Sequence, residues 1–322
     1  MSASVISRVG PRNPILLLGV GGILYRAWAA LLDDLGVSHI DLSYLELDLT
    51  QPETIRRHVE HGYPLVINCA AYTDVDGAES NPQPAMQING HGVGALAREC
   101  QAAGSMLVHY STDYVFSGQQ PRPWHVDDAC DPVNLYGQSK LLGEQLIRDS
   151  GAAHLIVRTS WLYAPWGKNF VRTIAKLASE RPSLRVVADQ FGRPTSAEHL
   201  AKGSFGLLER DAQGTLHLCD GGQCSWFDFA AEIVRISGHA CRVEPCSSSE
   251  FPRPARRPMN SVLDLSDTEA LIGPRPAWQD CLADVMARLE PGDTPVVVPR
   301  PSASEPAPAA EPVALGRVAP PA

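Results

Sequence analysis

Residues 14–22 read Pro-Ile-Leu-Leu-Leu-Gly-Val-Gly-Gly, an unbroken apolar run that ends in a glycine-rich turn. A continuous apolar run is typical of a strand that is buried on both faces of a parallel sheet. Residues 23–35 have the pattern of a helix. A glycine turn between such a strand and a helix presents backbone amides at the helix N-terminus, where they can bind a phosphate group. The stretch therefore predicts the opening unit of a dinucleotide-binding fold.

The same alternation of strands and helices continues along the chain. We predict strands over residues 64–68, 106–111 and 154–158, and helices over 82–103 and 136–146. This pattern predicts an α/β fold, a Rossmann-like doubly wound parallel sheet with a smaller C-terminal substrate-binding lobe. The predicted divisions are an N-terminal extension (1–13), a dinucleotide-binding core to which later segments return (14–165), the lobe (166–289) and a tail (290–322).

The composition excludes several classes of partner. The 322 residues carry a net charge of −9 with a pI of about 5.6, so no basic surface is available for a nucleic-acid backbone. No apolar run approaches the ~18 residues of a membrane span, and residues 1–8 lack the apolar core of a signal peptide. We expect a cytoplasmic protein that binds neither nucleic acid nor membranes. Residues 291–322 hold 9 of the 27 prolines, so we expect a disordered tail.

Tyr136 and Lys140 stand four residues apart in a predicted helix, on one helix face. With 8 Tyr and only 4 Lys in the chain, about 0.1 such pairs are expected by chance. An ammonium group beside a phenol can lower its pKa and make it a proton donor near neutral pH. The alternative is an ordinary exposed helix pair.

A second group of polar residues follows the predicted strand 106–111. Ser111, Thr112 and Asp113 stand at its carboxyl end, where open α/β sheets bind their ligands. A turn that closes the strand would use the same residue types. Ahead of the Tyr136–Lys140 helix, however, the combination is similar to the Ser/Thr, Tyr, Lys arrangement of the short-chain dehydrogenase/reductase superfamily.

Six blocks of sequence narrow this resemblance to the dTDP-4-dehydrorhamnose reductase family. They occur in the family's order and spacing, and the resemblance covers residues 14 to 289. The blocks are residues 68–79, 111–116, 134–140, 158–163, 189–195 and 256–261.

The resemblance implies an NAD(P)H-dependent oxidoreductase that reduces a nucleotide-linked 4-keto-6-deoxyhexose. The expected reaction is dTDP-4-dehydrorhamnose to dTDP-L-rhamnose or a related deoxysugar, with NADPH or NADH as cofactor and a possible homodimer as the assembly. Tyr136 would supply the proton, Lys140 would hold the nicotinamide ribose and lower the pKa of Tyr136, and Thr112 would align the substrate oxygen.

Other residues would contact the nucleotide sugar. Asp113 would bind a sugar hydroxyl. Trp161 would stack on the sugar, or else be a core aromatic. Arg193 and Arg257, the latter paired with Arg256, would bind the diphosphate, because guanidinium groups suit phosphate oxygens, or else be surface charges.

The resemblance also implies a set of cofactor contacts. They are Gly19, Gly22, Ile23 and Leu24 at the turn, Ser43 near the ribose, Asp48 and Leu49 at the adenine, Ala71, Tyr72 and Thr73 after the third strand, and Tyr136 and Lys140. Asn68 would fix a turn, and Asn89 would be either a structural polar residue or a support for Lys140.

Two positions depart from the family's cofactor pattern. The third glycine of the turn falls at Tyr25, where a side chain must take a different route or displace the packed seam. Ser43 offers no carboxylate for a ribose hydroxyl, which leaves NADPH admissible.

Tyr25 keeps two alternatives open. The first is a non-catalytic regulatory or binding subunit, like the reductase-related subunit of methionine adenosyltransferase. The second is a nucleotide-sugar epimerase or dehydratase.

The eight cysteines do not predict a metal site. Cys219 and Cys224, and then Cys241 and Cys246, form two Cys-x4-Cys pairs, and His217 stands near the first. Paired cysteines of structural zinc sites usually lie two to four residues apart. We therefore expect reduced thiols and no metal.

Overall fold

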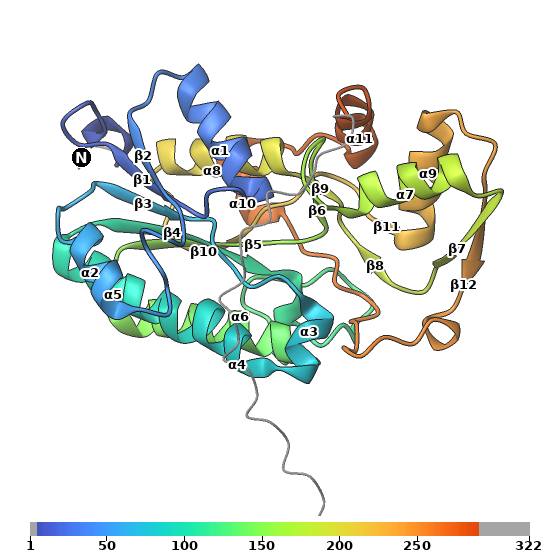
Figure 1. The fold of residues 1–322 in the computed structure, drawn as a ribbon, viewed down its shortest axis with the longest axis horizontal. Coiled ribbons are helices and arrows are strands. Elements are labelled where there is room, and N and C mark those ends of the chain that lie inside the picture. The colour runs from blue at the N-terminus through green and yellow to red at the C-terminus, as the bar shows by residue number, and fades with distance from the viewer. Residues whose placement is uncertain (1–4, 290–322) are drawn as a thin grey trace, which may run out of the picture.

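The computed structural model describes residues 5–289. Six parallel strands form the main sheet in the spatial order β2-β1-β3-β4-β5-β10 (Figure 1). Their bounds are β1 Ile15–Leu18, β2 His39–Leu42, β3 Leu65–Asn68, β4 Met106–Thr112, β5 His154–Thr159 and β10 Gly214–His217. The predicted fold class is confirmed.

The apolar run at residues 15–18 forms the strand β1 and is buried along its whole length. Its side chains alternate between two core clusters. Ile15 and Leu17 pack into the first, whereas Leu16 and Leu18 pack into the second. A central parallel strand needs apolar residues at every position for this reason.

Helices cover both faces of the sheet (Figure 1). One face carries α1 (Ile23–Asp34), α8 (Ala197–Glu209) and α10 (Ser266–Ile272). The other carries α2 (Pro52–Val59), α5 (Val93–Ala103) and α6 (Leu135–Ser150), with the short helices α3 (Val75–Ser80) and α4 (Pro82–Ala85) beside them. The fold is thus doubly wound.

The predicted helix over residues 82–103 is helical throughout but has three parts. A π-helical segment, η2 (Met86–Gly92), lies between α4 and α5. Such wide turns occur often near functional sites. The buried Asn89 lies within this segment.

A smaller lobe lies beside the sheet and contains α7 (Phe170–Glu180), α9 (Trp226–Ser237) and α11 (Trp278–Met286) (Figure 1). Its strands pair in twos, and Phe229 and Trp278 lie in its own core cluster. The pairs are β7 (Ser183–Val187) with β12 (Arg242–Cys246), β8 (Phe191–Gly192) with β11 (Cys224–Ser225), and β6 (Leu162–Tyr163) with β9 (Thr195–Ser196). Single 3-10 turns complete the description, namely η1 (Ile6–Arg8), η3 (Asp113–Val115) and η4 (Ser248–Glu250).

The chain leaves the sheet for the lobe and returns to it. After α7, β7, β8 and β9, it adds α8 and β10 to the main sheet, and later α10 packs against α8. Val5, the first residue that the structure describes, is buried in the core cluster of α1. The predicted tail (290–322) lies outside the described residues.

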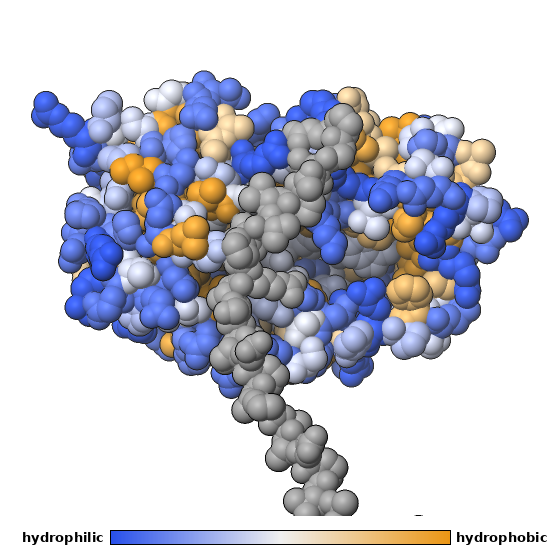
Figure 2. Space-filling view, in the orientation of Figure 1, coloured by the Kyte–Doolittle hydropathy of each residue, from blue (hydrophilic) through white to orange (hydrophobic). Residues whose placement is uncertain are grey.

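The position of the site follows from the strand order. The chain passes from β1 outward to β2 and then returns to β3 on the other side of β1. A crevice opens at such a switch point, at the carboxyl ends of the strands. Figure 2 shows a mainly hydrophilic face that is recessed between sheet and lobe, beside the grey residues. No helix within residues 5–289 is long and apolar enough to cross a membrane.

Candidate active site

The glycine turn after β1 passes directly over the end of β3. Gly19 has φ 101°, and a Cβ atom there would lie 2.7 Å from the Ala70 nitrogen and 2.8 Å from the Cys69 carbonyl carbon. Both the backbone conformation and the space therefore require glycine. Gly22 is the N-cap residue of α1, so Ile23 and Leu24 open the helix. The turn has the shape that a phosphate-binding loop needs.

Tyr25 takes a route that leaves the packing of α1 on the sheet intact. Its hydroxyl donates a hydrogen bond to Asp41 Oδ2 at 2.9 Å, at the end of β2. Burial, followed by Asp41, raises the pKa of Tyr25 to about 12. Leu24, Ala27 and Trp28 make the buried face of the helix instead. The side chain avoids the seam between helix and strand, so the conflict that the missing glycine suggested is resolved.

A carboxylate lies beside Ser43, the residue predicted to be near the ribose. Glu46 Oε2 accepts hydrogen bonds from Ser43 N at 2.9 Å and from Ser43 Oγ at 2.8 Å. These bonds lower the pKa of Glu46. Ser43 itself carries no carboxylate, but the folded turn brings the carboxylate of Glu46 against it. The Ser-x-x-Glu spacing of a capping box was the signal that could have revealed it.

The predicted adenine-side residues lie in a tight turn after β2. Asp48 Oδ1 accepts hydrogen bonds from the nitrogen and the hydroxyl of Thr50, each at 2.8 Å. Leu49 is buried, and its carbonyl approaches Gly92 so closely that a Cβ would not fit there. The carboxylate of Asp48 is thus held by its own turn.

The loop after β3 is held from two sides. Asn68 Oδ1 accepts a hydrogen bond from Ala70 N at 3.0 Å, so Asn68 fixes the turn as predicted. Asn89 binds both backbone groups of Tyr72, accepting from its nitrogen at 2.9 Å and donating to its oxygen at 3.0 Å. Ala71 and Thr73 remain exposed along this edge.

Asn89 also donates a hydrogen bond to Ser139 Oγ at 3.0 Å, which joins the loop to α6. Its side-chain bonds are therefore to Tyr72 and Ser139. These bonds agree with a structural role of Asn89, whereas support of Lys140 through a water molecule stays a prediction.

Thr112 ends β4, and Tyr136 and Lys140 lie in the first turns of α6. The helix begins at a fixed place because Asn134 Oδ1 accepts a hydrogen bond from Gly137 N at 2.7 Å. A Cβ at Gly137 would collide with the carbonyl of Tyr114, so glycine lets the helix approach the strand end. This approach brings Tyr136 close enough to Thr112 for the threonine hydroxyl to act on the pKa of the phenol.

The pKa of Tyr136 departs from the prediction. Burial, followed by the charge of Asp113, raises this pKa to about 12. The hydroxyl of Thr112 acts in the opposite direction, but its effect is smaller. The predicted lowering of this pKa by Lys140 is therefore not what the structure shows, because burial dominates.

Lys140 is buried, and burial lowers its pKa to about 8, although Glu144 acts in the opposite direction. Its Nζ lies 3.3 Å from His109 Nε2. The other ring nitrogen of His109 lies 3.1 Å from Asn68 Nδ2. Burial and Lys140 hold the pKa of His109 well below its usual value, so the imidazole is neutral. Sequence reasoning missed His109, which stands on β4 three residues before Thr112.

Glu144 is a second buried group on the inner face of α6. It accepts hydrogen bonds from Ser111 Oγ at 2.5 Å and from Arg158 Nε at 2.9 Å. Arg158 Nη2 also donates to Glu144 Oε2 at 2.7 Å. These bonds tie α6 to β4 and β5, one turn beyond Lys140, and hold the helix in place.

Asp113 is almost fully buried beside the two catalytic candidates. Its Oδ1 accepts a hydrogen bond from Thr112 Oγ1 at 3.0 Å, and its Oδ2 has no hydrogen-bond partner in the part of the chain that the structure describes. Burial raises the pKa of Asp113 to about 7, although the hydroxyls of Ser261 and Thr112 act in the opposite direction. The free oxygen suits the predicted contact with a sugar hydroxyl.

Trp161 has φ 47°, which is rare for a bulky residue and marks strain at functional positions. Its ring stacks on Trp226 with centroids 3.6 Å apart. A Cβ at Gly192 would lie 2.5 Å from the indole, so this glycine makes room for the ring. The side chain is partly exposed and belongs to the aromatic cluster of the lobe.

The arginines predicted at the diphosphate already have partners. Arg193 Nε donates to Leu263 O at 2.7 Å, and its Nη1 donates to Gly222 O at 2.5 Å. Arg193 therefore holds backbone segments together, which weighs against its predicted role. Arg257 pairs with Asp76 Oδ1 at 3.0 Å.

Arg257 nevertheless lies close to the catalytic candidates. Its guanidinium carbon lies 6.0 Å from the ring centre of Tyr114, and that ring meets Tyr136 edge-on at 6.1 Å. Arg256 is exposed. The pair of arginines thus splits into one residue near the site and one at the surface.

Comparisons with known proteins agree with this geometry. The family model of the RmlD substrate binding domain matches residues 13–290. A dTDP-4-dehydrorhamnose reductase of Burkholderia thailandensis is 41% identical over 297 residues, which cover 85% of this chain and 99% of the relative. The chain belongs to the dTDP-4-dehydrorhamnose reductase family. The predicted enzyme class, an NAD(P)H-dependent oxidoreductase, is confirmed with it.

Solved structures of this reductase family have the same fold. The reductase of Clostridium acetobutylicum is 36% identical with a TM-score of 0.82, covering 85% of this chain and 98% of that one. The reductase of Bacillus anthracis, solved in complex with NADP, is 34% identical with a TM-score of 0.82, covering 85% and 99%. A UDP-glucose 4-epimerase of Thermus thermophilus, at 18% identity and a TM-score of 0.72, shares the fold alone.

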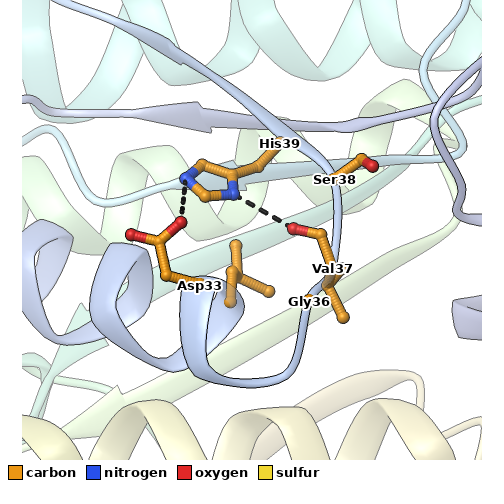
Figure 3. Close-up of a pocket in the computed structure, with 6 residues that line it drawn as sticks. Asp33, Gly36, Val37, Ser38 and His39 are labelled. Carbon is orange, nitrogen blue, oxygen red and sulfur yellow. Dashed lines mark hydrogen bonds and ion pairs between the residues drawn. The ribbon is translucent and has the colours of Figure 1, made fainter.

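A shallow hollow of this reductase-family chain lies elsewhere, between the end of α1 and the start of β2 (Figure 3). There His39 Nε2 lies 3.9 Å from Asp33, and its Nδ1 lies 3.1 Å from Val37 O. It is at the amino end of β2, opposite to the end where Gly19, Thr112 and Tyr136 gather. It is not part of the candidate site.

Proposed function

We propose that the chain is a cytoplasmic NAD(P)H-dependent reductase of a nucleotide-linked 4-keto-6-deoxyhexose, with dTDP-4-dehydrorhamnose as substrate and dTDP-L-rhamnose as product. The observation that carries the proposal is the convergence of Thr112, Tyr136 and Lys140 beside the glycine turn, at the carboxyl end of the sheet. Family membership supports the same reaction.

The turn fits a dinucleotide. Gly19 lets the turn pass against Ala70, where a Cβ would collide with the backbone, and the amides at the start of α1 are available to a pyrophosphate. Residues 71–73 line the next edge, and Lys140 would bind the nicotinamide ribose. When bound, the cofactor supplies a hydride for the C4 keto carbon.

Tyr136 would donate its phenolic proton to the keto oxygen, which becomes the alcohol. A pKa of about 12 makes the free phenol a stable proton store, so it stays protonated at neutral pH. Thr112 would orient the substrate oxygen through its hydroxyl, which donates a hydrogen bond to Asp113 Oδ1 in the free chain. Asp113 would bind a neighbouring sugar hydroxyl through its free Oδ2.

We infer that NADH binds better than NADPH. The carboxylate of Glu46 places a negative charge beside Ser43. The adenosine ribose of a dinucleotide binds near this position in the fold. A carboxylate accepts hydrogen bonds from ribose hydroxyls but repels a 2′-phosphate. Asp41, held by Tyr25, adds a second negative charge at the end of β2.

The alternative of a binding subunit loses the observation that favoured it, because Tyr25 is accommodated beside Asp41. A homodimer stays a prediction, and size-exclusion chromatography with light scattering tests it.

The proposal is tested with the purified chain by fluorescence titration with NADH and NADPH, followed by a reductase assay on dTDP-4-dehydrorhamnose. Binding and turnover support it. Binding without turnover on any nucleotide-linked 4-keto sugar supports the binding subunit and refutes the reductase.

A further inference from the structure

Three side chains from distant parts of the chain meet at a place that the proposed reaction does not use. His199 lies in the first turn of α8, Asp220 follows β10, and Cys281 lies on α11. His199 Nδ1 lies 2.9 Å from Cys281 Sγ and 3.4 Å from Asp220 Oδ1. The three ligand atoms all lie within 4.8 Å of one another.

Asp220 is the unusual member of this cluster. Its side chain is fully buried, and its Oδ2 accepts a hydrogen bond from Ser196 N at 2.8 Å. Its Oδ1, the oxygen nearest His199, has no hydrogen-bond partner among residues 5–289. A buried carboxylate oxygen without a partner is costly, and a bound cation is one way in which proteins satisfy it.

A positive group of the protein stands nearby but does not satisfy this oxygen. Arg275 Nη2 donates to the backbone oxygen of His199 at 3.2 Å, and Arg275 Nε is itself buried with no partner in the described region. The guanidinium of Arg275 therefore binds the backbone beside the cluster and does not bind Asp220. Asp220 Oδ1 faces His199 and Cys281.

We propose that His199, Asp220 and Cys281 bind a zinc ion. An imidazole nitrogen, a carboxylate oxygen and a thiolate are the donors that zinc takes. Tetrahedral zinc with bonds of about 2.0–2.3 Å separates nitrogen from oxygen by about 3.4 Å and nitrogen from sulfur by about 3.6 Å. The first spacing is already present, and the second needs a shift of Cys281 Sγ of about 0.7 Å from its 2.9 Å contact.

The partly exposed side of the cluster gives the zinc ion a route to its ligands. With three protein ligands, the fourth position of a tetrahedral zinc would be taken by water. The side chain of His199 is 26% exposed, whereas Asp220 and Cys281 are buried behind it. Burial, followed by the charge of Asp220, raises the pKa of Cys281, so the free thiol is protonated. Zinc must displace this proton, and its affinity therefore rises with pH.

The position predicts a structural role. α8 packs against α1 on the main sheet, whereas α11 packs against α9 in the lobe. A metal ion held by His199 on α8 and Cys281 on α11 would link the sheet layer to the lobe directly. Sequence spacing gave no sign of the site, because these two residues are 82 positions apart. The cysteine pairs weighed from the sequence are not among the ligands.

The test uses the full-length chain after treatment with a chelator. Zinc binding is measured by calorimetry, and cobalt is added separately to look for the thiolate-to-cobalt absorption and the intense visible bands of a tetrahedral site. One equivalent of zinc per chain is expected, together with a rise in Tm. Asp220→Asn and Cys281→Ser are each expected to weaken binding by at least about tenfold.

Cys219→Ser is the matched control, because Cys219 is an equally buried thiol that lies 3.3 Å from Ser160 Oγ. This variant is expected to bind zinc normally. His199→Gln replaces either test variant that fails to fold, because His199 is the most exposed ligand. A wild-type chain that binds no stoichiometric zinc, or that binds it equally well without Cys281, overturns the proposal.

Discussion

Replacing Asp113 by Asn changes the pH dependence of stability in a predictable direction. The folded carboxyl has a pKa of about 7 against its ordinary value of 3.8. The folded state therefore keeps its proton over a range where the unfolded chain has lost it. Because the unfolded chain binds fewer protons there, stability falls as pH rises from about 4 to about 7.

The magnitude follows from the same two values. The difference between about 7 and 3.8 corresponds to about 4 kcal/mol of destabilisation by the buried charge above pH 7. Asn has no charge to bury and keeps an oxygen that accepts the bond from Thr112. Asp113→Asn should therefore match the wild type near pH 4 and exceed its stability by up to about 4 kcal/mol above neutrality.

Urea denaturation of both chains at several pH values measures this difference. Other titrating groups, such as Lys140, act equally in both chains and cancel. Asp128→Asn is the control with the opposite sign, because Arg122 holds the pKa of Asp128 low. That variant should lose stability at neutral pH and approach the wild type in acid. A stability difference for Asp113→Asn that does not change with pH would refute the reasoning.

Three further predictions concern the site. Tyr136→Phe should lower kcat by at least about 100-fold through loss of the proton donor, with cofactor affinity in fluorescence titration nearly unchanged. Glu46→Gln should raise the affinity for NADPH a few-fold relative to NADH, whereas an unchanged ratio in paired titrations would place the ribose elsewhere. Gly19→Ala should lower both Tm and cofactor affinity, because the new methyl group would lie 2.7 Å from Ala70 N at a φ of 101°. Gly36→Ala is the control and should lower Tm alone, because Gly36 also has a positive φ but no described atom lies within 4 Å of its Cβ position.

The sequence was sufficient for the parts that depend on local pattern. The run at residues 15–18 forms a strand because each of its side chains faces a core, and alternation with helices determines a parallel sheet. Tyr136 and Lys140 lie on one face because they are one helical turn apart. Thr112 joins them because it ends the strand that the helix covers.

The rest depended on contacts that no local pattern contains. The partner of Tyr25 is Asp41, on a different strand, so the route of its ring was not visible in the glycine motif. Arg193 meets carbonyl groups at residues 222 and 263, which only the folded lobe brings to it. The pKa of Tyr136 rose although a lysine stands one turn away, because burial depends on every neighbouring segment.

Burial also brings the pKa values of Asp113 and Lys140 close to each other. Removing water raises the pKa of Asp113 to about 7 and lowers that of Lys140 to about 8, so both groups titrate near neutral pH. A negative charge on Asp113 raises the pKa of Tyr136, whereas a neutral Asp113 relaxes it. The sugar hydroxyl that Asp113 is proposed to bind would donate a hydrogen bond to its carboxylate and, like the hydroxyl of Thr112, would lower this pKa and favour the charged form. The charge on Asp113 would then continue to hold the proton on Tyr136, and this proton would leave only when the substrate oxygen has become basic enough to accept it.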